Sequence, residues 1–153
     1  MIALTLRLPT KLIMTLLLSL SFSLPTFGKE LVLVSSATAN YEPLSSFEVR
    51  KIFLGYPIKR NNISLIAIRN KSDEESYQIF LQKVIHLSAR NYERRLMSKT
   101  FRTGTALVSS IDTLPALTHK LLSNKANLSV MWLKDVERNH NLKVVQVVWE
   151  EEK

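Results

Sequence analysis

Residues 69–76 (RNKSDEES) are the part of this sequence whose residue types and spacing best suit a chemical task. They lie where a predicted buried strand gives way to a predicted helix. Free backbone amides at a helix start, beside Arg69, Lys71 and the hydroxyls of Ser72 and Ser76, can bind a small oxyanion. Three carboxylates in the same turn oppose an anion, so the residues alone favour a capped helix over an anion site.

Other constellations for catalysis or metal binding are weak. The three histidines, His86, His119 and His140, lie far apart and lack His-x-x-His or Glu-x-x-His spacing. Residues 73–75 fall in a helical first turn, where carboxylates favour the helix dipole, and residues 150–152 form an acidic tail. The chain has no cysteine, which excludes disulfides, thiolate metal sites and cysteine nucleophiles. We therefore expect no enzyme activity, no metal and no cofactor.

Glycine is scarce in the chain beyond residue 28. Only Gly55 and Gly104 occur there, and two glycines cannot build either standard glycine-rich phosphate loop. We expect each of them where the backbone needs a positive φ or a close approach.

A strand, a helix and a second strand are predicted before the 69–76 turn. Residues 30–35 (ELVLVS) form a short apolar, β-branched run. Ser45, with Glu48 three residues later, forms a capping box that opens an amphipathic helix ended by Gly55. The apolar residues of this helix are Phe47, Val49, Ile52, Phe53 and Leu54. Residues 63–68 (ISLIAI) predict a second buried strand, which ends at Arg69.

Two further helices are predicted after the turn. Ser72, with Glu75 three residues later, forms a second capping box and opens a helix that runs to about Ile85. Ser88 caps a helix over residues 89–100. In that helix Tyr92, Leu96 and Met97 are expected to face inward, and Arg90, Arg94 and Arg95 outward.

The last third of the chain completes an α/β pattern. Apolar residues in 110–123 recur at helical spacing, with Pro115 tolerable only in the first turn. Residues 127–133 predict a third strand, residues 134–139 a short helical turn, and residues 142–149 a fourth strand. This order predicts one α/β domain, with a mixed sheet of about four strands flanked by helices.

Residues 1–28 differ in kind from the rest of the chain. Two basic residues and no acidic ones precede a thirteen-residue apolar run, residues 12–24, and small residues stand at Thr26 and Gly28. This pattern predicts a signal peptide cleaved after Gly28, leaving residues 29–153 as an exported, periplasmic or secreted domain. A retained membrane anchor is the alternative, but the run is shorter than the roughly 20 residues that a membrane span needs.

The chain carries a formal net charge of +8, from 21 Lys and Arg against 13 Asp and Glu. Loss of Arg7 and Lys11 with the first 28 residues leaves 19 basic residues against 13 acidic ones, a net charge of +6. RNA-binding signatures are missing, so we expect no nucleic-acid partner. The charge is interpreted as a solvated surface, with attraction to small anions or to an anionic envelope surface as the alternative.

One segment resembles a known family. Residues 44–55 (LSSFEVRKIFLG) resemble the S-x-x-E-[LV]-x-x-I-F-L-G segment of phosphate-type periplasmic substrate-binding proteins of ABC transporters. The resemblance continues in order through residues 63–69, 76–85, 92–104 and 113–133. It covers roughly residues 30–148, and its most specific part is the Ile-Phe-Leu-Gly of residues 52–55.

The resemblance implies a type II periplasmic-binding-protein-like fold, here a single lobe, with phosphate or a similar oxyanion as ligand. The family's turn after the second strand reads like R-S-D-G-S-G-T and holds phosphate through backbone amides and hydroxyls. Arg69, Ser72 and Ser76 match that turn here, and Thr103 and Thr105 are further ligand-binding candidates.

Two functions from different classes remain open. The first is a non-enzymatic solute-binding-like protein for an oxyanion, with an inner-membrane permease as partner. The second is a lobe that has lost its ligand and docks on a membrane sensor or transporter through an exposed apolar patch. An oxyanion site predicts Arg69 and free helix amides converging on an open pocket. An interaction module predicts carboxylates filling that position.

Overall fold

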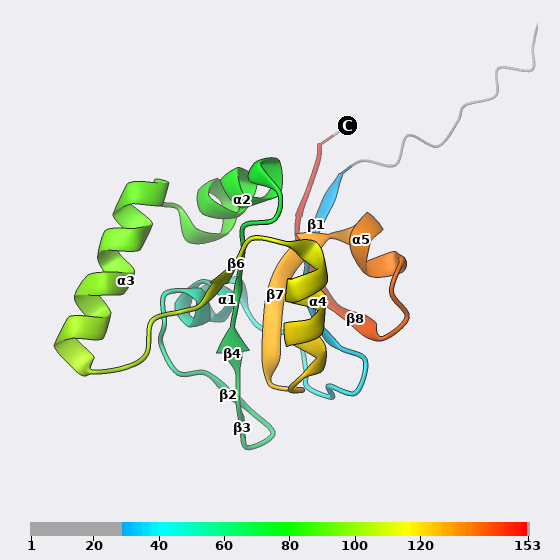
Figure 1. Ribbon diagram of the computed structural model, residues 1–153, viewed down its shortest axis with the longest axis horizontal. Helices are drawn as coiled ribbons and strands as arrows, with labels where there is room; N and C mark the ends of the chain where they lie inside the picture. Colours follow the sequence, from blue (N-terminus) through cyan, green and yellow to red (C-terminus); the bar gives the residue numbers. More distant parts are fainter. Residues whose placement is uncertain (1–28, 153) are drawn as a thin grey trace, which may run out of the picture.

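A four-stranded mixed sheet forms the centre of the computed structural model, which describes residues 29–152 (Figure 1). Its strands lie in the order β4 (Ile66–Ala67), β7 (Asn127–Trp132), β1 (Glu30–Ser36) and β8 (Leu142–Glu150). β1 pairs antiparallel with both β7 and β8, and β4 pairs parallel with β7. The α/β class with a mixed sheet of about four strands is therefore confirmed. The predicted signal peptide, residues 1–28, lies outside the described residues.

Helices cover both faces of the sheet, and β1 contributes to both cores because its side chains alternate. Leu31 and Leu33 belong to the larger apolar cluster, whereas Val32 and Val34 belong to the smaller one. The larger cluster packs under α1 (Ser46–Phe53), α2 (Glu74–Ile79), the π-helix η1 (Phe80–Ile85) and α3 (Ala89–Thr103). The smaller cluster packs under α4 (Leu114–Leu122) and α5 (Leu133–Glu137).

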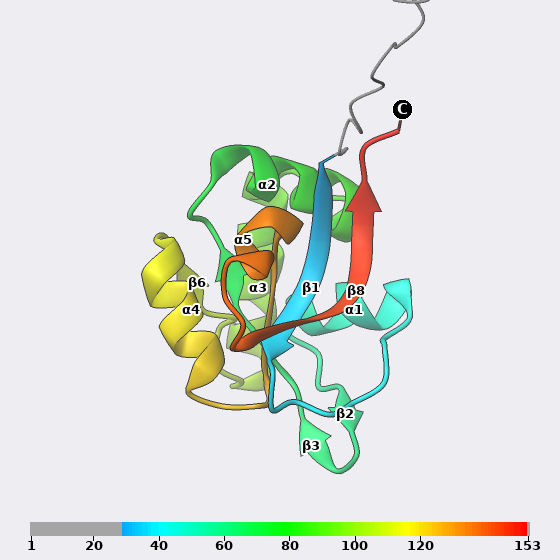
Figure 2. The ribbon, with the colours of Figure 1, turned by 90° about the vertical axis from the view of Figure 1, so that its right-hand side faces the viewer.

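The long β1 and β8 strands run side by side, with both ends of the described chain at one end of the pair (Figure 2). Glu30 pairs with Glu150, and Ser36 pairs with Leu142. The register shifts twice along this ladder, between Leu31 and Val32 and between Leu33 and Val34. β8 forms one edge of the sheet and contacts η1.

The predicted strand over residues 63–68 is divided between two ladders, and residues 69–70 form a third, which corrects that prediction. β3 (Ile63–Ser64) pairs with β2 (Lys59–Arg60), β4 joins the main sheet, and β5 (Arg69–Asn70) pairs parallel with β6 (Ser110–Ile111). The turn at Asn61 and Asn62 explains the first of these pairings, because both residues have positive φ (48° and 63°) and so suit a tight hairpin.

Helix boundaries follow the predicted capping signals with one correction. Ser45 and Glu48 form the reciprocal capping box of α1, and Ser88 caps α3. At α2, however, the cap is Asp73, whose carboxylate accepts from the Ser76 amide, so Ser72 does not begin the helix. A carboxylate competes well for this position because it also favours the helix dipole.

Both glycines beyond residue 28 have positive φ, as expected: 81° at Gly55 and 65° at Gly104. The inward positions of α3 are confirmed for Tyr92 and Leu96, but Met97 is 51% exposed. Phe47, one of the apolar residues of the predicted helix after Ser45, is also exposed, at 65%. Within residues 29–152, no helix has both the length and the apolar character needed to cross a membrane.

Candidate functional site

Arg69 occupies β5 and is almost fully buried, at 3% exposure. Its Nε donates to the carbonyl oxygen of Val108 at 3.1 Å, and its guanidinium carbon lies 5.7 Å from the centre of the Tyr92 ring. One terminal nitrogen, NH1, donates to Oε1 of Glu93 at 2.5 Å. The guanidinium is therefore already engaged by a carboxylate from α3 and by the backbone.

Glu93 links two cations of the predicted oxyanion turn. The same Oε1 that accepts from Arg69 lies 3.1 Å from Nζ of Lys71. Burial raises the pKa of Glu93, but the hydrogen bond from Lys71 and the charge of Arg69 outweigh it, so the pKa lies below its usual value. Glu93 is ionised at neutral pH and supplies an anion at this position.

The amino end of α2 is also capped by a carboxylate of the same chain, that of Asp73. Oδ1 of Asp73 accepts from the Ser76 amide at 2.8 Å and from the indole nitrogen of Trp132 at 2.9 Å. Desolvation raises the pKa of Asp73, but the hydrogen bonds from Ser76 and Trp132 and the charge of Lys134 together lower it by more, so the carboxylate stays charged. Ser72 donates both its amide and its hydroxyl to Oδ1 of Asn70, at 3.0 and 2.6 Å.

The two hydroxyls predicted to bind ligand are therefore committed to local bonds. The Ser72 hydroxyl bonds Asn70, and the Ser76 hydroxyl donates to the backbone carbonyl of Asp73 at 3.0 Å in a residue only 3% exposed. The candidates Arg69, Ser72 and Ser76 lie on the corner that runs from β5 to the start of α2. Carboxylates of the same chain, Glu93 and Asp73, bond the groups at this corner.

Thr103 and Thr105 lie elsewhere. Thr103 is the last residue of α3, ten residues beyond Glu93, which is about 15 Å along a helix. Its hydroxyl bonds the Lys99 carbonyl at 2.8 Å, and the Thr105 hydroxyl accepts from Nζ of Lys99 at 3.0 Å. The five candidate residues thus divide into two separate groups.

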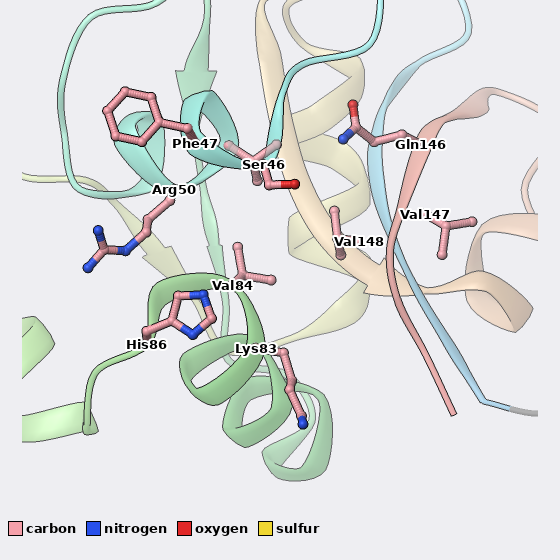
Figure 3. A pocket seen from close by; sticks show the side chains of 10 residues that line it. Ser46, Phe47, Arg50, Lys83, Val84, His86, Gln146, Val147 and Val148 are labelled. Atoms are coloured by element: carbon pink, nitrogen blue, oxygen red, sulfur yellow. The ribbon is translucent and has the colours of Figure 1, made fainter. Parts of the chain in front are cut away.

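A cavity of about 240 Å³ lies between α1, η1 and β8 (Figure 3). Its apolar lining includes Phe47, Val84 and Val148, and Arg50 and His86 stand beside them. Arg50 is held in place by a hydrogen bond from its Nε to the carbonyl oxygen of Ile85, at 2.9 Å. Sequence reasoning missed this cavity, because the residues that line it are up to 102 positions apart and Phe47 reads as a core residue.

Groups for metal binding are lacking in the part of the chain that the structure describes. Among residues 29–152, no three His, Cys, Asp or Glu side chains gather closely enough to hold an ion. His86, His119 and His140 lie on η1's end, on α4 and in the loop before β8, respectively.

Comparison with known proteins yields structural neighbours only. No protein-family model matches the chain, and no curated protein matches it. An ABC-type phosphate transport receptor from Vibrio cholerae matches with a TM-score of 0.57 at 11% identity, over 78% of this chain and 46% of the receptor.

Two further solved structures match similarly. A putative phosphate ABC transporter substrate-binding protein from Clostridium perfringens, with bound phosphate, gives a TM-score of 0.58 at 11% identity, over 78% of this chain and 45% of its own. PstS from Borrelia burgdorferi gives 0.54 at 10% identity, over 78% and 47%. The chain thus spans just under half the length of these proteins. At such identities the likeness concerns the fold alone: the chain shares the architecture of part of these proteins.

Proposed function

We propose that this chain is an exported, non-enzymatic lobe of the periplasmic-binding-protein type that acts as an interaction module for a membrane sensor or transporter. The observation that carries the proposal is the Glu93 carboxylate, which pairs with both Arg69 and Lys71. Together with Asp73 at the start of α2, it supplies internally the negative charge that a bound oxyanion would bring. A lobe whose ligand corner is filled in this way can keep its shape without a ligand.

The cavity between α1, η1 and β8 supports a docking role. Phe47 is 65% exposed at its edge, although a side chain of this size is usually withdrawn from water. Arg50, Lys83 and His86 surround the apolar lining. An apolar floor with a basic rim suits a partner segment that combines apolar and acidic side chains.

Oxyanion capture at residues 69–76 is the second candidate, and one observation favours it. Two cations, Arg69 and Lys71, share the single carboxylate of Glu93, whose side chain is 36% exposed. A phosphate or similar oxyanion that displaced Glu93 would meet both cations, with Ser72 and Ser76 nearby and a permease as the downstream partner. Of the structural neighbours, one is described as an ABC-type phosphate transport receptor and another as a putative phosphate ABC transporter substrate-binding protein with bound phosphate.

Thermal unfolding in phosphate, sulfate and chloride at matched ionic strength separates the two candidates. If Glu93 is a permanent substitute for the ligand, the native chain responds equally and weakly to all three anions. Glu93→Gln removes the internal charge, and phosphate should then stabilise the variant selectively through Arg69 and Lys71. Glu137→Gln is the matched control, because Glu137 is exposed on α5 and makes no ion pair among the described residues.

A phosphate-selective rise in the native chain would instead favour oxyanion capture. A ligand at a hundred times its Kd adds about 2.7 kcal/mol, which corresponds to several degrees for a domain of this size. Loss of that rise in Arg69→Ala would then place the oxyanion at residues 69–76.

Docking itself is tested by a photoreactive amino acid at position 47 in the exporting cell. We expect a covalent adduct with one membrane protein from position 47. The same group at Leu122, which is 42% exposed on α4, is the control. Equal adducts from both positions would contradict a docking surface at the α1, η1 and β8 cavity.

A further inference from the structure

The outward face of α3 combines exposed apolar and cationic side chains. Phe101 is 83% exposed and Met97 is 51% exposed. Arg90 and Arg94, also exposed, fall on the same face, because the four residues recur at three- and four-residue intervals. α3 lies at the outer edge of the molecule, on the side away from α4 (Figure 1). Its outward face is therefore open to a partner.

No negative charge balances these cations within residues 29–152. Glu93 is the sole acidic residue of α3, and it is turned to Arg69 and Lys71. No carboxylate oxygen of the described residues lies within 4.0 Å of the basic groups on the rest of the helix, which are Arg90, Arg94, Arg95, Lys99 and Arg102. Like charges three or four residues apart weaken a helix, so this arrangement is not explained by the stability of α3.

A cavity of about 270 Å³ lies on the neighbouring side of α3, lined by Tyr56, Arg95, Ser98, Lys99 and Arg102 together with Leu54. Lys99 is only 7% exposed. Its ammonium donates to the Thr105 hydroxyl at 3.0 Å and lies 5.3 Å from the centre of the Tyr56 ring. Burying an ammonium without a counter-ion costs free energy, which an anion entering the cavity would recover.

From these observations we propose that the outward face of α3 docks on an anionic phospholipid surface. Phe101 and Met97 enter the boundary between headgroups and acyl chains. The arginines lie against lipid phosphates, and one headgroup phosphate enters the cavity beside Lys99. A small soluble anion would account for the cavity but not for Phe101 and Met97, whereas a lipid surface accounts for both. Basic residues around exposed aromatic and aliphatic side chains are typical of helices that lie in a membrane interface.

Vesicle co-sedimentation of the full chain tests this proposal. Vesicles of phosphatidylcholine alone are compared with vesicles that also contain phosphatidylglycerol, at low and at physiological salt. We expect binding to the anionic vesicles, with weaker binding at higher salt because the charges are screened. Each basic residue near an anionic membrane contributes about 1 kcal/mol, or roughly fivefold in partitioning.

The variants compared share the same first 28 residues, so their differences report on α3. Arg90→Gln with Arg94→Gln should lower partitioning more than tenfold, and Phe101→Ser and Lys99→Met should each lower it several-fold. Lys120→Gln with Lys125→Gln is the matched charge control, and Leu122→Ser is the apolar control. These residues are exposed on or just after α4, and their variants should bind like the native chain. Thermal unfolding confirms that each variant is folded.

Three results would overturn the proposal. The first is equal binding of the native chain and the α3 variants. The second is equal binding to neutral and anionic vesicles. The third is selective stabilisation by free inorganic phosphate that Lys99→Met abolishes, in a chain that does not bind vesicles, because the cavity would then hold a soluble anion.

Discussion

The indole N–H of Trp132, the last residue of β7, donates to the carboxylate of Asp73 across 2.9 Å. The two residues are 59 positions apart, and the same oxygen of Asp73 also caps α2. The Asp73 carboxylate thus links the first turn of α2 to the end of β7. This hydrogen bond stabilises the turn over residues 69–76, which resembles a phosphate-binding turn.

Asp73→Ala should lower the free energy of unfolding by about 1 to 2 kcal/mol, because the helix loses its cap and the Trp132 indole loses its acceptor. Asp73→Asn keeps an acceptor oxygen and should lose less. Urea denaturation followed by Trp fluorescence measures both. Equal losses in the two variants would show that charge, rather than the cap geometry, carries the effect.

Glu93→Gln should make stability less dependent on pH in acid. The pKa of Glu93 is lowered in the folded state, so its ion pairs contribute fully above the unfolded value of about 4.5 and are lost as pH falls through the lower folded pKa. The native chain should therefore exceed the variant in stability at pH 7, and the two should converge as pH falls below the lowered folded pKa of Glu93. Thermal unfolding between pH 7 and pH 3 measures this difference, and a constant difference would contradict the assignment.

Tyr92→Phe should destabilise the chain by about 1 to 3 kcal/mol. The Tyr92 hydroxyl is fully buried and donates to the carbonyl oxygen of Phe53 at 2.6 Å, which ties α3 to the end of α1. Phenylalanine keeps the ring but leaves that buried carbonyl without a donor. Burial raises the pKa of Tyr92, so the hydroxyl stays protonated and this loss should not change between pH 6 and pH 9.

Gly55→Ala and Gly104→Ala should lose similar amounts of stability. Both glycines have positive φ, which costs about 1 to 2 kcal/mol for a residue with a Cβ. At Gly55 the new Cβ would make only ordinary van der Waals contacts, 3.4 Å from a methyl of Val108 and 3.5 Å from the Lys99 side chain, and at Gly104 nothing lies within 4 Å. Denaturant midpoints of the two variants measure the losses, and a much larger loss at Gly55 would show that crowding against Val108 adds to the backbone strain.

Residues that are close together in the chain were sufficient to predict much of the fold. The capping box at Ser45 and Glu48, the cap at Ser88, the two positive-φ glycines and the apolar run of β1 all depend on residues close in the chain. The division of residues 63–70 among three ladders could not be predicted from neighbouring residues. It depends on which partners, β2, β7 and β6, reach each pair of residues.

The same distinction holds for the candidate site. The sequence by itself determined that Arg69, Ser72 and Ser76 stand at a strand-to-helix turn with carboxylates nearby, since these residues are neighbours in the chain. Only the tertiary structure decided that Glu93 pairs with Arg69 and that Trp132 bonds Asp73. It also decided that Phe101 and Met97 face outward. Pairing across 24 or 59 residues and the exposure of a helix face depend on how elements pack, which no local pattern of residues specifies.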